Sequence, residues 1–241
     1  MKLNDRQIEL YSRQIILREL GGLGQRKLLE SRCLAVGGGP ALETAVSYLT
    51  GAGVGALDLW PATDPHRAVT AGDEAQRLDL IRSAERAPET AVRVVSPRED
   101  VDLDRYDVVL VASVRAVGSP SSAILPASAT GQARQGTIGI LLDPGRWLGL
   151  LLTPTVSASC PSCTRLDDAA PARDPVPEPT EDALALPLTG AMAALAAVLW
   201  LAGIAQEIEP RGLRLAADAA TWVDAGIVRD LPCKRGCRPR T

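Results

Sequence analysis

Residues 31–60 read SRCLAVGGGPALETAVSYLTGAGVGALDLW, and this stretch decides the fold. Its first apolar run, residues 33–36, ends in three glycines, which predicts a buried strand that leads into a tight turn. Pro40 suits the first position of a helix, and apolar residues at helical spacing continue to Thr50. A second apolar run, residues 56–60, predicts another strand. A strand, a turn, a helix and a strand in this order are typical of a βαβ unit with parallel strands.

The alternation continues on both sides of this stretch. Residues 1–31 are predicted to be helical and amphipathic, and a helix is predicted over residues 72–87. Further strands are predicted at residues 92–95, 107–112 and 137–142, as a strand pair around 147–153, and as closing strands at 214–217 and 222–228. The pattern predicts an α/β fold with a doubly wound, mostly parallel, Rossmann-like sheet, N-terminal helices and C-terminal strands.

The length of 241 residues suits a single large domain over residues 1–241. Within it we predict N-terminal helices (1–31), a Rossmann-like core (32–159), a zinc knuckle followed by an acidic, proline-rich crossover linker (160–182), and a C-terminal segment with a helix, strands and a second cysteine pair (183–241). Hydrophobic residues make up 46% of the chain, which excludes an intrinsically disordered protein.

The formal charge of −3 gives no electrostatic reason to expect nucleic acid or an anionic membrane as a partner. The polar start of the chain does not resemble a signal peptide, so we expect a cytoplasmic protein. Residues 183–205 carry no charge, which leaves two interpretations, a buried helix and a membrane span. The high Ala and Gly content favours a helix packed in the interior or at a subunit interface. His66, the single histidine, is predicted to lie in an exposed loop.

Four cysteines form two close pairs, Cys160 with Cys163 and Cys233 with Cys237. Two converging pairs of thiolates suit tetrahedral Zn²⁺, and a site with four cysteines leaves no position for water. The sequence therefore predicts one structural zinc ion. Disulfides and a redox-active pair are the alternatives, and nothing in the sequence indicates the secretion that stable disulfides require. The fifth cysteine, Cys33, is predicted to be a small core residue, with a catalytic thiol as the alternative.

A strand followed by G-x-G and a helix is typical of a turn that binds a phosphate, because glycines allow close approach and the helix N-terminus offers free N–H groups. Gly37 and Gly39 fit this pattern as nucleotide-binding residues. Leu42 stands where a third glycine is expected, Pro40 removes one N–H donor, and Glu43 adds a carboxylate to the first helical turn. We therefore predict a turn whose anion binding is weakened.

The N-terminal third closely resembles the opening of the ThiF/MoeB/HesA family. The strings that carry this resemblance are Tyr11-Ser-Arg-Gln-Ile-Ile-Leu17, Gly24-Gln25, Leu28-Leu29, Ser31-Arg32, the glycine turn, Tyr48-Leu49 and Ala52-Gly53-Val54-Gly55. The two cysteine pairs also lie where that family holds its zinc. The resemblance implies a dimer that binds Mg·ATP and adenylates the C-terminal glycine of a ubiquitin-like or sulfur-carrier protein. It also implies that Arg13 reaches nucleotide phosphates bound by the neighbouring subunit.

Several positions depart from the family pattern. Trp60-Pro61-Ala62 stands where the family has an acidic residue for the ribose hydroxyls, and Val114 stands where it has a magnesium-binding aspartate. The loop over the phosphates is shorter and keeps only Arg67, Ala75 replaces a lysine, and no cysteine lies between 164 and 232. Because losing one such group commonly costs about 10²–10³ in rate, we do not expect this chain to use ATP and Mg²⁺ efficiently by itself.

These observations predict a catalytically degenerate partner subunit of an adenylating system, in a heterodimer with an intact ThiF-like protein and donating Arg13 in trans. One alternative is a scaffold that binds a peptide or carrier in a peptide-modification pathway. Another is an active adenylyltransferase of a sulfur-carrier-type protein with an altered ATP pocket. The sequence leaves open the identity of the carrier and the choice between a homodimer and a heterodimer.

Overall fold

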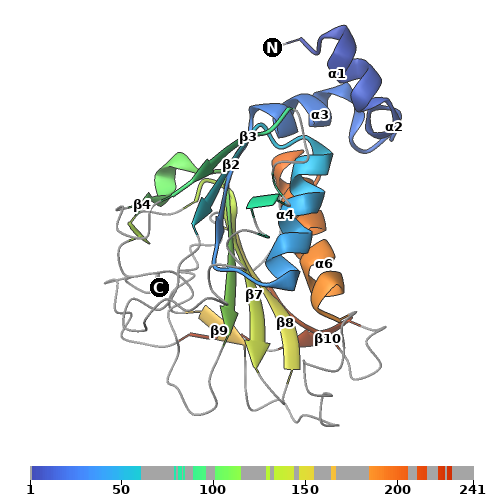
Figure 1. Ribbon diagram of the computed structural model, residues 1–241. Coiled ribbons are helices and arrows are strands. Elements are labelled where there is room, and N and C mark those ends of the chain that lie inside the picture. The colour runs from blue at the N-terminus through green and yellow to red at the C-terminus, as the bar shows by residue number, and fades with distance from the viewer. Residues whose placement is uncertain are drawn as a thin grey trace.

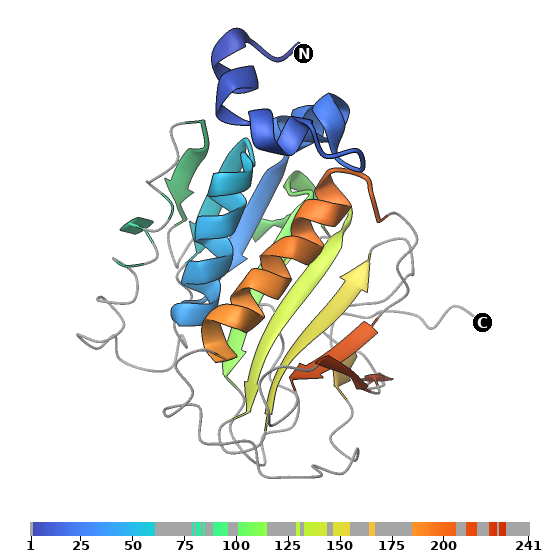
Figure 2. The same ribbon diagram turned by 90° about the vertical axis from the view of Figure 1, so that its right-hand side faces the viewer.

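The structure is a computed structural model (Figures 1 and 2). It describes residues 2–60, 79, 81–82, 84, 89–95, 101–114, 129–130, 133–143, 147–154, 164–166, 185–205, 211–215, 222–225 and 227–229. The strands are β1 Arg32–Val36, β2 Ala56–Trp60, β3 Ala91–Val94, β4 Val101–Asp102, β5 Val108–Val114, β6 Ala129–Thr130, β7 Gly136–Asp143, β8 Trp147–Pro154, β9 Thr164–Leu166, β10 Arg211–Leu215, β11 Trp222–Ala225 and β12 Ile227–Arg229. The helices are α1 Asp5–Leu10, α2 Ser12–Ile15, α3 Gly21–Glu30, α4 Pro40–Ala52 and α6 Ala185–Leu201, with a 3₁₀ turn, η1, at Leu103–Arg105.

A single sheet organises the fold, with strand order β11-β10-β8-β7-β5-β1-β2-β3. The block from β3 to β7 is parallel, because β1 pairs in parallel with β2 and β5, β2 with β3, and β5 with β7. The other edge is antiparallel, through β7 with β8, β8 with β10, and β10 with β11. The predicted α/β fold with a mostly parallel sheet is confirmed.

The two long helices α4 and α6 lie side by side against one face of the sheet (Figure 2). Both run in the same direction, and the helices α1–α3 lie at the end of the molecule where α4 and α6 finish (Figure 2). α4 begins with Pro40 and ends at Gly53, whose positive φ of 86° gives a left-handed cap. α6 approaches α4 closely, since a Cβ on Gly190 would collide with the carbonyl oxygen of Ala41.

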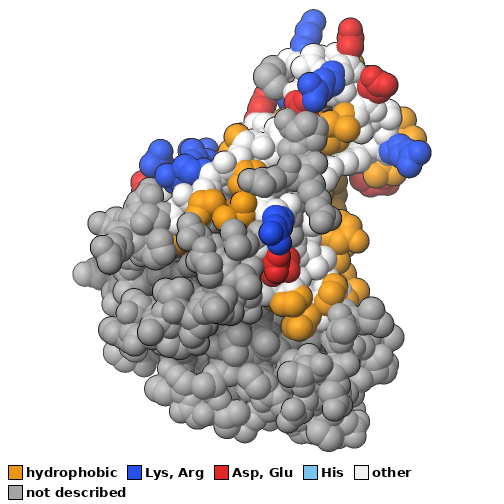
Figure 3. All heavy atoms as spheres, in the orientation of Figure 1, with side chains coloured by type: hydrophobic (Ala, Val, Ile, Leu, Met, Phe, Trp, Pro, Cys, Tyr) orange, Lys and Arg blue, Asp and Glu red, His pale blue; other side chains and the backbone are white. Residues whose placement is uncertain are grey.

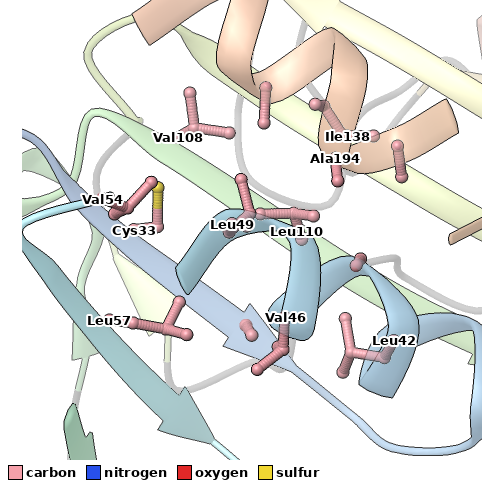
Figure 4. Close-up of a cluster of buried hydrophobic side chains, with 14 of the residues drawn as sticks. Cys33, Leu42, Val46, Leu49, Val54, Leu57, Val108, Leu110, Ile138 and Ala194 are labelled. Carbon is pink, nitrogen blue, oxygen red and sulfur yellow. The ribbon is translucent and has the colours of Figure 1, made fainter. Parts of the chain in front are cut away.

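The core between these helices and the sheet is made of aliphatic side chains (Figure 4). β1 and β5 each contribute alternate residues, for example Cys33 and Leu110, and α4 contributes Leu42, Val46 and Leu49. This alternation is what a strand with one face against helices requires. The uncharged segment 183–205 contains the helix α6, and among the described residues no helix is long and apolar enough to cross a membrane.

Three predicted elements differ from the structure. The strand pair expected around residues 147–153 is one unbroken strand, β8, because all eight of its residues pair with β7. The closing strand expected at 214–217 begins earlier, at Arg211. The strand expected at 222–228 is divided into β11 and β12, which pair in different sheets. Periodicity alone cannot identify the strand that supplies the hydrogen bonds.

Some predictions fall partly or wholly outside the described residues. In the helix predicted over 72–87, residues 79, 81, 82 and 84 are helical. His66, Arg67 and Ala75 lie outside the described residues, as do Cys160, Cys163, Cys233 and Cys237. The division into segments at 1–31, 32–159, 160–182 and 183–241 stays a prediction.

Candidate functional site

The strand order points to one crevice in the parallel block. From β1 the chain moves to β2 and β3 on one side, and it later returns to β5 on the other side of β1. In open α/β sheets, ligands bind beyond the carboxyl ends of the strands at such a switch point. The glycine turn follows β1 at this point, next to the end of β5.

Gly37 joins the turn to both neighbouring strands. Its N–H donates to the carbonyl oxygen of Trp60 at 2.9 Å. Its φ is 103°, and a Cβ at this position would lie 2.6 Å from the carbonyl oxygen of Ala112 in β5. Only glycine accepts both this backbone conformation and this contact.

The N-terminus of α4 presents free hydrogen-bond donors to the crevice. Gly39 is the N-cap and has no capping side chain, and a Cβ on it would meet nothing within 4 Å. Among the described residues, none accepts a hydrogen bond from the N–H groups of Gly38, Gly39, Ala41 or Leu42. These groups and the helix dipole favour a negative charge. The turn therefore keeps free N–H donors, although Pro40 contributes none.

The side chains around the turn do not complete a nucleotide site. Glu43 lies in the first turn of α4, where burial and, to a lesser extent, the nearby Asp79 raise the pKa of its carboxyl group. Trp60 ends β2, its side chain is buried, and its indole N–H has no hydrogen-bond partner among the described residues. β5 ends with Val114. Within the described part of the crevice, neither β2 nor β5 ends in a carboxylate that could hold a ribose or Mg²⁺.

Arg13 lies at the opposite end of α4. Tyr11, two residues earlier, is buried with its ring against the backbone of Gly53, where a Cβ would lie 2.6 Å from the ring. Gln14, one residue later, donates from Nε2 to the carbonyl oxygen of Gly51 at 3.3 Å. Arg13 itself is exposed, and no hydrogen bond or ion pair joins it to another described residue.

The length of α4 separates Arg13 from the glycine turn of its own chain. α4 has 13 residues, which corresponds to about 20 Å along the helix axis. Tyr11 and Gln14 contact the last residues of α4 and its cap, whereas Gly37 and Gly39 precede its first residue. The structure therefore does not bring together two predicted parts of the site, Arg13 and the turn.

The short sheet formed by β9 and β12 bears on the predicted zinc site. β9 begins at Thr164, directly after Cys163, and β12 ends at Arg229, four residues before Cys233. The strands are antiparallel, and Arg229 pairs with Thr164. The start of β9, which follows the first cysteine pair, and the end of β12, which precedes the second pair, therefore lie at the same end of this two-stranded sheet. Among the described residues, no cluster of potential metal ligands is found.

A buried ionic cluster that the sequence pattern does not reveal lies on the sheet face away from α4. Asp58 of β2 is 2% exposed and accepts hydrogen bonds from Arg32 (2.7 Å), Arg93 (2.9 Å) and the Tyr106 hydroxyl (2.7 Å). Burial alone would raise the pKa of Asp58, but these three donors outweigh it and hold the pKa below its usual value. Arg32 also lies over the ring of Tyr106, 5.4 Å from its centroid. The cluster links β1, β2 and β3 to Tyr106, which lies two residues before β5.

Cys33 is fully buried in the core, as predicted. Burial in apolar surroundings is the main reason why the pKa of its thiol is raised far above the usual value. A thiol that stays protonated at neutral pH is a poor nucleophile, so the alternative of a catalytic thiol is disfavoured.

Known proteins share parts of this sequence. The chain is 47% identical over 64 residues to the sulfur carrier protein ThiS adenylyltransferase of Escherichia coli (27% of this chain, 26% of the relative). It is 48% identical over 88 residues to the adenylyltransferase and sulfurtransferase MOCS3 of Culex quinquefasciatus (34% and 20%). It is 47% identical over 58 residues to the molybdopterin-synthase adenylyltransferase of Salmonella typhimurium (24% and 23%). These partial matches support a relationship to the ThiF/MoeB family.

The fold of this chain is similar to solved structures over nearly its whole length. The structure of E. coli MccB with MccA-N7isoASN gives a TM-score of 0.59 at 13% identity and covers 94% of this chain and 74% of that one. MccB with ATP gives 0.59 at 11% identity, covering 97% and 74%. PaaA gives 0.53 at 15% identity, covering 92% and 74%. At these identities the similarity establishes the fold alone.

No family model matches the sequence. The matched segments also make up about a quarter of the curated ThiF/MoeB relatives or less. The activity, substrates and partners of this chain are therefore proposals.

Proposed function

We propose that this chain is a catalytically degenerate partner subunit of an ATP-dependent adenylating system and that Arg13 acts on a nucleotide bound by the other subunit. The observation that carries this proposal is the position of Arg13. Tyr11 and Gln14 attach its helix to the end of α4 that lies farthest from the glycine turn. An exposed arginine at this position is too far from the glycine turn of its own chain to contact a nucleotide there, but a neighbouring subunit could bring its nucleotide to it.

Mg·ATP fits the described residues of this chain only in part. The free N–H groups of Gly38 and Gly39 suit a phosphate, but Trp60 and Val114 offer no carboxylate for the ribose or for Mg²⁺. Phosphoryl chemistry depends on positioning and on stabilising charge, so a site without these groups is not expected to be competent. The active nucleotide site belongs, in this proposal, to an intact ThiF-like subunit of a heterodimer. The substrate is a ubiquitin-like or sulfur-carrier protein.

The test measures ATP–pyrophosphate exchange by the ThiF-like subunit that copurifies with this chain, in the presence of its carrier protein. Arg13→Ala is expected to lower the rate about 10²–10³-fold, because it removes the positive charge that would stabilise the phosphates. Arg18→Ala, another exposed arginine in the same N-terminal region, is the matched control and should leave the rate unchanged. Full activity with the Arg13→Ala protein would refute the role of Arg13.

A measurement of nucleotide binding by this chain alone distinguishes a degenerate partner subunit from an active adenylyltransferase. A ligand present at 100 times its Kd stabilises a protein by about 2.7 kcal/mol. We expect no stabilisation of the purified chain by millimolar Mg·ATP in thermal unfolding. A clear increase in melting temperature, lost in a Gly39→Asp variant, would favour the active enzyme with an altered pocket.

A scaffold that holds a peptide or carrier is a second candidate. It is favoured by the similarity of nearly the whole fold to MccB, which was crystallised with MccA. This function needs neither a nucleotide nor Arg13. Recovery of a peptide or carrier with the purified chain, without any ThiF-like protein, would support the scaffold over the partner subunit.

We further propose that Cys160, Cys163, Cys233 and Cys237 hold one structural zinc ion. The pairing of Thr164 with Arg229 supports this, because it brings the chain from both cysteine pairs to one end of the β9–β12 ribbon. Four thiolates suit Zn²⁺, which would link the two segments and supply no chemistry. Elemental analysis is expected to find one zinc per chain, and Cys163→Ser to reduce it. A Cys33→Ser variant should keep the metal, and a metal-free wild-type protein would refute the site.

A further inference from the structure

The N-terminal helices α1 and α2 project from the rest of the molecule, and charged side chains of both signs gather on this projection (Figures 1 and 3). A projecting segment keeps one direction only if more than one contact holds it, because a single contact leaves it free to rotate. Two contacts are already described: the ring of Tyr11 lies against Gly53, and Gln14 donates to the carbonyl oxygen of Gly51. Both lie close to Arg13 in sequence, after α1. The direction of α1 therefore depends on a contact of its own.

Gln7 makes this contact from the middle of α1. Gln7 and Tyr11 are one helical turn apart, so they lie on the same face of the helix, and both are buried, at 7% and 3% exposed. The Nε2 atom of Gln7 donates to Oε2 of Glu89 at 3.2 Å. Its Oε1 atom accepts a hydrogen bond from the backbone N–H of Asn4, also at 3.2 Å. Residue 7 must therefore be both a donor and an acceptor, which suits an amide side chain.

Glu89 belongs to the rigid part of the fold. It lies two residues before Ala91, the first residue of β3, whose N–H donates to the carbonyl oxygen of Gly55 at 2.9 Å. The Glu89 side chain is 18% exposed, and its second oxygen lies 3.4 Å from Nε of Arg6, a largely exposed side chain. Burial is the main cause of the raised pKa of Tyr11, and the charge of Glu89 adds to it. The carboxylate therefore lies close to both buried residues of the α1 face.

We propose that Glu89 is a positioning residue for Arg13. Its carboxylate holds Gln7, and the ring of Tyr11 on Gly53 holds the same face of α1 about 5 Å further along the helix. Two contacts fix a direction that one contact does not. Tyr11 caps α1 and precedes Arg13 by two residues, so a movement of α1 displaces Arg13 as well. The contact of Arg13 with a nucleotide rests on the proposed function, whereas the hold of Glu89 on α1 does not.

Hydrogen exchange of the full chain, followed by mass spectrometry, tests the hold on α1. Glu89→Ala should speed the exchange of the amides in α1 and α2 about 10-fold, because a hydrogen bond to a charged acceptor is lost. The amides of α4 should exchange as in the wild type, which shows that the rest of the fold is intact. Glu9→Ala is the matched control, since Glu9 is an exposed glutamate of α1, and it should change nothing. No difference between Glu89→Ala and the wild type would overturn the proposal.

Exchanging the two side chains tests the hydrogen bond itself. Gln7→Glu alone sets two carboxylates against each other and should speed the exchange as Glu89→Ala does. Gln7→Glu combined with Glu89→Gln restores the bond in the reverse direction, and the new carboxylate can still accept the N–H of Asn4. The double variant should therefore return to within about twofold of the wild type, because each remaining difference is small. A double variant as fast as Gln7→Glu would overturn the proposal.

ATP–pyrophosphate exchange by the ThiF-like subunit tests the effect on Arg13. Glu89→Ala should lower the rate about 10-fold, because a displaced charged group stabilises the phosphates less well, and the exchanged pair of side chains should restore it. In an Arg13→Ala background, Glu89→Ala should have no further effect. An equal loss with and without Arg13 would show that Glu89 does not act through it and would overturn the proposal.

The two assays separate this inference from the proposed function. Full activity of the ThiF-like subunit with Arg13→Ala would refute the proposed function and, with it, the effect of Glu89 on the rate. Hydrogen exchange would still decide whether Glu89 holds α1.

Discussion

The two ends of α4 differ in what surrounds them. At the C-terminal end, Tyr11 packs on Gly53, Gln14 binds the carbonyl of Gly51, and Gln25 donates to the carbonyl of Ala52 at 2.9 Å. At the N-terminal end, the N–H groups of Gly38 and Gly39 are free, and no carboxylate from β2 or β5 accompanies them among the described residues. The end near Arg13 is held by side-chain contacts, whereas the end that would bind a nucleotide offers backbone N–H groups without the carboxylates that a nucleotide site requires.

This difference is what the proposed role requires. A subunit that donates an arginine in trans needs a rigid structure around that arginine, but it does not need a complete nucleotide pocket. A subunit that itself adenylates a carrier needs the complete pocket as well. Substitutions at each end of α4 and in the neighbouring sheet test this difference.

The largest effect is expected for Tyr11→Ala. Removing this buried ring leaves a cavity against Gly53 and should lower the free energy of unfolding by about 3–5 kcal/mol. Tyr48→Ala, which truncates a tyrosine that is 61% exposed, is the control and should change stability by less than about 0.5 kcal/mol. Urea denaturation measures both. Equal, small effects would mean that Tyr11 does not anchor the N-terminal helices.

The two glycines of the turn should respond differently to alanine. In Gly37→Ala the new methyl group meets the Ala112 carbonyl at a positive φ, and we expect a loss of about 3 kcal/mol. In Gly39→Ala only the strain of the positive φ applies, since the space beside it is open, and about 1–2 kcal/mol is expected. Thermal unfolding of both variants makes the comparison. A greater loss for Gly39→Ala would contradict the described contact between β1 and β5.

Acid should weaken the ionic cluster in the sheet. The pKa of Asp58 is lowered in the folded state, so its contribution is complete above the unfolded value of about 3.9 and is lost as the pH falls through the folded value. Asp58→Asn should cost about 2 kcal/mol at neutral pH, because two arginines and Tyr106 lose their charged acceptor. Unfolding measured from pH 7 down to acid should show a smaller loss in the variant than in the wild type. Parallel curves would show that Asp58 does not carry the linkage.

The smallest effect is a gain. Gly51 lies exposed inside α4, and a Cβ on it meets nothing within 4 Å. Gly51→Ala should therefore stabilise the protein by about 0.5–1 kcal/mol and leave the Gln14 contact to the backbone carbonyl in place. A loss measured by urea denaturation would mean that the surroundings of this end of α4 are described wrongly.

Much of the fold could be predicted because local patterns determine it. The apolar run from Cys33 to Val36, the glycines and Pro40 specify a strand, a turn and a helix without reference to the rest of the chain. The strands at the antiparallel edge were harder. β8 is one strand because it pairs along its whole length with the neighbouring strand β7, and β12 pairs with the distant strand β9. Hydrophobic periodicity reveals neither pairing.

Arg13, Gly37 and Gly39 stay predictions as site residues, and the sequence could not predict how they are arranged. Their separation along α4 becomes visible only when Tyr11 is seen against Gly53. The weakened anion binding of the turn also stays a prediction. Pro40 removes one donor, but the N–H groups of Gly38 and Gly39 have no acceptor among the described residues. The Asp58 cluster escaped notice because its members are far apart in the chain.

A crystal structure of this chain with a ThiF-like partner, an ATP analogue and Mg²⁺ would show directly where the nucleotide binds. We predict ordered phosphates only in the partner's pocket, with the guanidinium group of Arg13 in contact with them. Ordered phosphates over Gly37 and Gly39 of this chain, with Arg13 remote from any nucleotide, would contradict it.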